Sequence, residues 1–190
     1  MGLTLNSLSL SSGSGSGLTE EDVKDLIEYE YITRVPVTSA AVLSVTDSID
    51  STLYDGFKFS LINLRLSTAG SMTFKILDSS GTAYTKNAYT TIFQSTSRSY
   101  GNISTFTSTT IQLTSSITTD AYGEIQVDCR HDSTISGRYS MNYFTNTNGF
   151  SHGSFTASPA STFGGIELVT SSGTFNEQGE VRVYGRKKRS

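Results

Sequence analysis

Hydrophobic and polar residues alternate with a period of two along most of the chain from residue 39 onward. The clearest case is Glu124–Cys129, in which Ile125, Val127 and Cys129 alternate with polar residues. A strand places every second side chain on the same face, so this alternation predicts half-buried β-strands. The same pattern recurs in Phe57–Leu61, Met72–Ile76, Tyr139–Tyr143, Ile166–Leu168 and Val181–Val183. Less regular strands are expected near residues 40–46, 88–94 and 110–117.

The alternation changes parity once, within one of these stretches. Odd-numbered positions are apolar from Phe57 to Leu61, and even-numbered positions are apolar from Ile62 to Leu66. A slip of one residue moves every following side chain to the other face of a sheet. The change therefore predicts a β-bulge near Leu61–Ile62, or burial of both faces there.

About eight to ten strands at turn-separated intervals indicate an all-β fold. Such a count favours a two-sheet sandwich over residues 39–190, with a jelly roll as the expected topology. The last two strands flank a connection that contains Gly173, Asn176 and Gly179, residues that suit turns. We expect these strands to form a hairpin-like closing pair.

Residues 1–17 have a different composition from the rest. A run of Ser and Gly from Ser11 to Gly17 predicts a linker. Such a segment buries too little surface to offset its conformational entropy. It is either a disordered tail or, as we infer, an extended arm that a neighbouring chain holds. The anchoring residues would be Leu3, Leu5, Leu8 and Leu10.

Residues 18–34 are predicted to form one short amphipathic helix. Thr19 is a good N-cap, Asp22 can complete a capping-box arrangement, and Pro36 ends the helix. The apolar stripe of this helix would pack either on its own domain or on identical copies of the chain. We assign the stripe to an oligomer contact. The stripe consists of Val23, Leu26, Ile27 and Tyr31.

Two segments of the chain carry motifs that can be compared with known proteins. One is Leu18–Arg34, and the other is the closing segment with Gly173-Thr174-Phe175, Gly179 and Tyr184-Gly185. They resemble segments of small β-sandwich virion structural proteins of tailed, marine-type bacteriophages. The resemblance implies a fibre- or decoration-like protein, a homotrimer, attached to other virion proteins of the capsid, neck or tail through its first 32 residues. The basic ending Arg186–Arg189 departs from the family pattern, which stops soon after Tyr-Gly.

Composition narrows the functional classes. Charged residues make up 16% of the chain and Ser plus Thr about a third, which is typical of low-charge β-proteins on exposed surfaces. The net charge of −3 gives no general attraction to nucleic acid or to anionic membranes. A single cysteine, Cys129, suits folding in a reducing cytoplasm. The chain shows no long apolar span and no signal peptide.

The residues that could perform chemistry are few. Cys129 and His131 lie two apart and could supply two metal ligands, but a closed zinc site needs four. His152 lies among serines without the Gly-x-Ser-x-Gly elbow of a hydrolase. Four cations at Arg186–Arg189 without interleaved aromatic residues would bind DNA weakly. We therefore assign no catalytic residue, metal or cofactor.

These patterns, together with the resemblance, predict a non-enzymatic structural component of a virion assembled in the host cytoplasm. The alternative is a tail-fibre tip module that binds a receptor or a host-surface carbohydrate. In that case exposed tyrosines on loops would stack on sugar rings. The candidates are Tyr84, Tyr89, Tyr100 and Tyr143.

Overall fold

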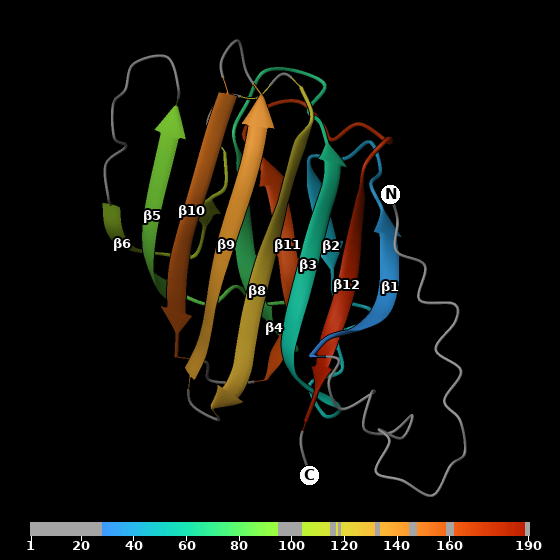
Figure 1. The fold of residues 1–190 in the computed structure, drawn as a ribbon, viewed down its shortest axis with the longest axis vertical. Helices are drawn as coiled ribbons and strands as arrows, with labels where there is room; N and C mark the ends of the chain where they lie inside the picture. Colours follow the sequence, from blue (N-terminus) through green and yellow to red (C-terminus); the bar gives the residue numbers. More distant parts are fainter. Residues whose placement is uncertain are drawn as a thin grey trace, which may run out of the picture.

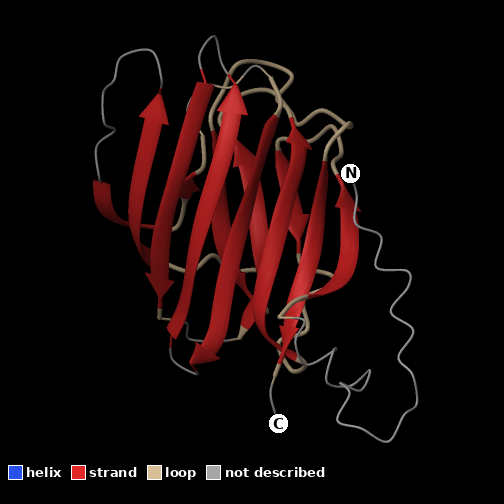
Figure 2. Ribbon diagram, viewed as in Figure 1, coloured by secondary structure: helices blue, strands red, loops and turns tan. Residues whose placement is uncertain are grey.

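The computed structural model describes residues 28–94, 104–114, 117, 119–131, 134–144, 148–158 and 162–188. These residues form twelve β-strands in two antiparallel sheets that pack face to face as a sandwich (Figures 1 and 2). The expected all-β sandwich is confirmed. The strands are β1 (Glu30–Pro36), β2 (Val42–Val45), β3 (Tyr54–Leu64), β4 (Met72–Asp78), β5 (Lys86–Gln94), β6 (Ser104–Ser108), β7 (Ile111–Gln112), β8 (Ala121–His131), β9 (Thr134–Phe144), β10 (Asn148–Ala157), β11 (Phe163–Thr170) and β12 (Glu180–Lys187).

The two sheets differ in width. One has eight strands in the order β1-β12-β3-β8-β9-β10-β5-β6, and the other has four in the order β2-β11-β4-β7. Four pairs join early strands to late ones: β1 with β12, β2 with β11, β3 with β8 and β4 with β7. The remaining strands β9, β10, β5 and β6 extend the larger sheet beyond β8.

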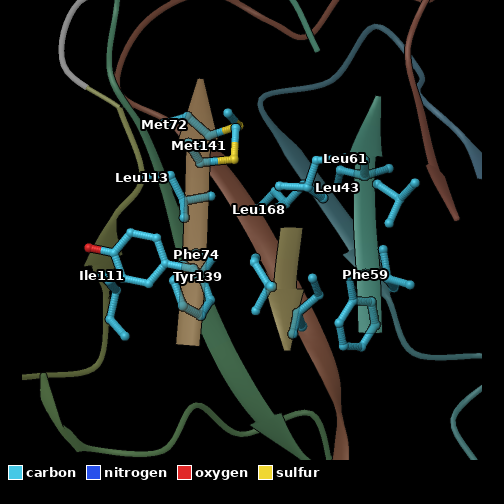
Figure 3. Packing of buried hydrophobic residues seen from close by; sticks show 14 of the residues in the cluster. Leu43, Phe59, Leu61, Met72, Phe74, Ile111, Leu113, Tyr139, Met141 and Leu168 are labelled. Atoms are coloured by element: carbon cyan, nitrogen blue, oxygen red, sulfur yellow. The ribbon is translucent and has the colours of Figure 1, made fainter. Parts of the chain in front are cut away.

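The core lies between the two sheets, where the apolar side chains of each alternating strand meet (Figure 3). Phe74 of β4 packs edge-to-face on Tyr139 of β9 and Phe155 of β10, with ring centroids 5.7 and 5.6 Å apart. Because aromatic residues bury large areas, such contacts dominate the packing of the sandwich. The strands predicted at Met72–Ile76 and Tyr139–Tyr143 are confirmed, with their alternate apolar residues buried.

The predicted bulge in β3 is also confirmed. Leu61 pairs with Gly123 and Leu64 with Ala121, so β3 has one more residue than β8 across this interval. Asn63 provides the extra length with a φ of 55°, a left-handed conformation that asparagine tolerates better than most residues. Both Leu61 and Leu64 are buried as a result.

Two expectations about element pairing were wrong. The closing strands do not form a hairpin, because β11 belongs to the four-stranded sheet and β12 to the eight-stranded one. The helix over 18–34 is wrong for Glu30–Arg34, which lie in β1 and pair with β12. A short helix is marginal in water, whereas pairing with β12 satisfies the backbone of this segment. Glu28 and Tyr29 are described and are not helical, whereas residues 18–27 of the predicted helix, including Val23, Leu26 and Ile27, fall outside the described residues, as do Leu3, Leu5, Leu8 and Leu10.

Candidate ligand-binding groove

A groove of about 410 Å³ lies on the outer face of the eight-stranded sheet. It forms over β8, β9, β10 and β12, with Glu28 and Tyr29 at one side where the chain leads into β1. Alternation explains its character, because Val127 and Phe155 point into the core while their strand neighbours point outward. Its outward side chains are Gln126, Asp128, Arg130, Ser136, Arg138, Ser154, Thr156 and Arg186.

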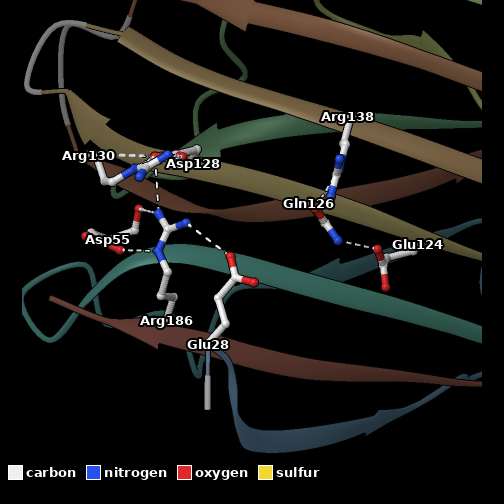
Figure 4. Close-up of polar contacts among 8 residues, drawn as sticks. All are labelled: Glu28, Asp55, Glu124, Gln126, Asp128, Arg130, Arg138 and Arg186. Atoms are coloured by element: carbon white, nitrogen blue, oxygen red, sulfur yellow. Dashed lines mark hydrogen bonds and ion pairs between the residues drawn. The ribbon is translucent and has the colours of Figure 1, made fainter. Parts of the chain in front are cut away.

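Arg186 is the centre of an ion-pair cluster at one end of the groove (Figure 4). Its Nε donates to Oδ1 of Asp55 at 2.7 Å, and its Nη2 lies 3.3 Å from Oδ1 of Asp128. Nη1 is 3.9 Å from Oε1 of Glu28. A Cβ built on Gly56 would be 2.8 Å from Nη2, so glycine at this position makes room for the guanidinium group.

Burial and neighbouring charges shift the pKa of Asp128 in opposite directions. Burial alone would raise the pKa of Asp128, but hydrogen bonds from Arg130 and the charges of Arg186 and Arg130 outweigh it and lower the pKa. The carboxylate therefore stays ionised to a lower pH than that of an ordinary aspartate. Both oxygens of Asp128 accept from Nε of Arg130, at 3.0 and 2.9 Å.

A second row of polar side chains crosses the groove. Gln126 donates its amide hydrogen to Glu124 on the same strand and accepts from Nε of Arg138 on β9 at 2.7 Å (Figure 4). The cross-strand pairing of Gln126 with Arg138 places these two side chains side by side. Gln126 thus orients the exposed guanidinium group of Arg138.

The segment that leads into β1 is held by further side-chain contacts. Glu30 accepts a hydrogen bond of 2.6 Å from the hydroxyl of Tyr54 and lies 2.9 Å from Nζ of Lys187. The hydrogen bond to Glu30 raises the pKa of Tyr54 to about 12. Nζ of Lys58 lies 5.3 Å from the ring centroid of Tyr29 and 4.8 Å from that of Tyr184.

The structure corrects two of the tyrosines proposed for glycan stacking. Tyr143 lies on β9 with its ring in the core, and Tyr84 is buried with its hydroxyl donating to the carbonyl of Thr162. Neither ring is available to a sugar in this arrangement, because both aromatic rings fill space between the sheets. Tyr89 lies on β5, and its side chain is outside the described part, as is the whole of Tyr100.

The basic ending is not a free cationic tail as far as Lys187. Arg186 and Lys187 belong to β12 and are neutralised by carboxylates of the same chain. Lys188 donates its backbone N–H to the carbonyl of Leu53 at 3.0 Å. Arg189 is outside the described residues.

The groups considered for metal or nucleophilic chemistry lie elsewhere. Cys129 packs partly against the core, and burial raises the pKa of its thiol to about 12. Within the described ranges, no group of three or more His, Cys, Asp or Glu residues is placed to hold a metal ion. His152 is exposed on β10, where its ring is 5.3 Å from that of Phe150.

Sequence patterns identified the outward face of β8 but missed the groove. The alternation marked Gln126 and Asp128 as outward and solvated, and Arg186 as part of a terminal charge run. Their convergence depends on strand order, because β12, β3 and β8 are neighbours in the sheet but distant in sequence.

No protein-family model, curated protein or solved structure matches this chain. In the part of the chain that the structure describes, no helix has the length and apolar character needed to cross a membrane.

Proposed function

We propose that the protein is a non-enzymatic structural component of a tailed-phage virion, assembled in the host cytoplasm and displaying its β-sandwich on the particle. Residues 1–17 anchor it to other virion proteins of the capsid, neck or tail. The observation that supports this most directly is the way the chain joins the sandwich. Glu28, Tyr29 and Glu30 are tied to the body of the domain by side-chain contacts as well as by the pairing of β1.

Such a junction suits a domain that is held through its N-terminal end. β1 pairs with β12 from Glu30 to Pro36, so a pull on the arm is shared among several backbone hydrogen bonds. The contacts of Glu30 with Tyr54 and Lys187 reinforce the first pair of this ladder. The sandwich is thereby fixed to whatever holds the arm.

Strand order supports a jelly roll as the topology of this displayed domain. The pairs β1–β12, β2–β11, β3–β8 and β4–β7 form one long antiparallel ribbon that alternates between the two sheets. A wrapped ribbon of eight strands is the plan of jelly rolls, which recur in viral capsid and lectin domains. We interpret β5, β6, β9 and β10 as insertions that widen one sheet.

The proposal includes a homotrimer with contacts at the junction. β1 is an edge strand of its sheet, and edge strands offer unpaired backbone groups to a neighbouring chain. Tyr31 on this strand is 57% exposed and contacts Tyr184 edge-to-face at 5.7 Å. Its exposure supports a contact with a second copy, although on a strand rather than on a helix.

The experiment compares incorporation of variants into particles. We expect deletion of residues 1–17, or replacement of Leu3, Leu5, Leu8 and Leu10 by serine, to leave a folded domain that no longer joins the particle. A matched control scrambles Ser11–Gly17 at constant length and composition, and should be incorporated normally. Normal incorporation of the deletion variant would refute the anchoring role, and absence of the wild-type protein from purified particles would refute the virion assignment.

The groove supports a second candidate function, that of a receptor- or carbohydrate-binding module at a fibre tip. It combines a tyrosine ring, hydroxyl groups, an amide and charged groups in one concave site, the mixture that orients small polar ligands. Copy number separates the two functions. Many copies spread over the shell indicate decoration, whereas a few copies at a tail extremity indicate adhesion.

A further inference from the structure

Arg138 differs from the other two arginines of the groove. Arg130 is paired with Asp128, and Arg186 with Asp55 and Asp128. Within the described residues no carboxylate pairs with Arg138, whose only hydrogen bond there runs from Nε to Gln126. That bond fixes the plane of the guanidinium group and leaves its two terminal nitrogens for a planar acceptor. Two parallel hydrogen bonds from such nitrogens are the preferred way to bind a carboxylate.

The rest of the lining suits a ligand with many hydroxyl groups. Ser136, Ser154 and Thr156 present hydroxyls that both donate and accept hydrogen bonds. The ring of Tyr29 gives an aromatic wall. The volume of about 410 Å³ falls within the range of roughly 300–1,000 Å³ that is usual for small-ligand sites.

We propose that the groove binds a saccharide that bears a carboxylate, with Arg138 holding the carboxylate and the remaining polar groups binding sugar hydroxyls. This inference rests on the second candidate function and names its ligand class. The carboxylates of Glu28 and Asp128 also lie in the groove. They repel polyanions such as nucleic acid or a strongly acidic peptide, but they accept hydrogen bonds from neutral hydroxyl groups.

The test uses the full chain and saccharides in matched pairs. Each oligosaccharide containing a hexuronic or sialic acid is presented on an array in its acid form and with the carboxylate reduced to an alcohol. Calorimetry then gives the dissociation constants of the acid forms that bind. We expect acid forms to bind and Arg138→Gln to weaken them roughly tenfold to a hundredfold, since hydrogen bonds between charged groups have about that effect.

Two further variants make the result specific. Arg138→Lys retains the charge without the planar fork and should recover only part of the affinity. Arg65→Gln removes an exposed arginine that follows β3, at the end opposite Gly56, and should leave binding unchanged.

Each outcome decides something different. Equal binding of acid and alcohol forms, or acid binding that survives Arg138→Gln, overturns the carboxylate assignment and leaves carbohydrate binding in place. Failure of the wild-type protein to bind any saccharide overturns both. Binding of an acidic peptide or of DNA that depends on Arg138, without saccharide binding, overturns the ligand class.

Discussion

Replacing Arg186 with methionine removes the cation at the centre of the groove cluster while retaining most of the aliphatic stem. The side chains of Arg186, Asp55 and Asp128 are 16%, 17% and 24% exposed, so water compensates only partly for the lost contacts. Removal of one partner from a fully buried pair costs about 3–5 kcal/mol, and a hydrogen bond to a charged group contributes about 1.5–3 kcal/mol. For this partly exposed cluster we expect a loss of about 2–3 kcal/mol in the free energy of unfolding.

Arg130→Met is the matched control, because it makes the same substitution on another partner of Asp128. The side chain of Arg130 is 59% exposed, and we expect a much smaller loss because water screens exposed ion pairs. The contrast between the two variants therefore tests whether burial, rather than the number of ion pairs, determines the stabilisation.

Urea unfolding at pH 7, followed by circular dichroism and by tyrosine fluorescence, measures both losses. With a denaturant slope of about 2 kcal/mol per molar urea, Arg186→Met should lower the midpoint by about 1–1.5 M. Asp55→Asn should reduce the effect of Arg186→Met in a double-mutant cycle. Equal losses in the two arginine variants, or a loss below about 1 kcal/mol for Arg186→Met, would show that the cluster does not act as described.

The same reasoning predicts how the stabilisation from Asp128 changes with pH. The pKa of Asp128 is lowered in the folded protein, so the unfolded chain takes up its proton first as the pH falls. The stabilisation from this carboxylate is complete above about pH 4, the ordinary value of an aspartate, and is lost as the pH falls through the folded pKa. The difference between wild type and Arg186→Met should therefore shrink in acid.

Two other predictions concern single positions. Asn63→Val should destabilise the fold by about 1–2 kcal/mol in urea unfolding, because a β-branched residue is strained at a φ of 55°, whereas Asn63→Gly should be nearly neutral; equal stability of the two variants would contradict the bulge geometry. Cys129, whose pKa is raised to about 12 by burial, should be alkylated by iodoacetamide at pH 8 roughly a thousandfold more slowly in the native than in the urea-unfolded protein. Rapid native labelling, followed by mass spectrometry, would contradict that burial.

Alternation predicted most of the strands that line the core and the break in β3, but it missed β10, which contributes Phe155 and Ala157 to the core. The change of parity after Leu61 corresponds to the extra residue at Asn63, which keeps both Leu61 and Leu64 buried. The same alternation could not show which of the two sheets each strand joins. The connection between Thr170 and Glu180 is long enough to cross between sheets, yet its turn residues also suited a hairpin.

The segment around Tyr31 shows how tertiary pairing overrides a local pattern. Its apolar residues fit one face of a helix, but they also alternate with Glu28, Glu30 and other polar neighbours. Pairing with β12 selects the strand over the helix, because Glu30–Pro36 forms backbone hydrogen bonds with the edge of β12. β12 lies about 150 residues further along the chain, so the residues around Tyr31 alone could not predict this pairing.

The groove and the attachment of the N-terminal segment depend on shared residues. Glu28 contacts Arg186, and Tyr29 both lines the groove and faces Lys58. A truncation that ends at residue 17 leaves these contacts intact, whereas one that removes β1 would open the groove and expose β12 as an edge. Loss of particle incorporation with ligand binding retained is therefore the signature of the arm alone. Loss of both together would instead place the attachment within the junction, where Glu28, just ahead of β1, contacts Arg186 of β12.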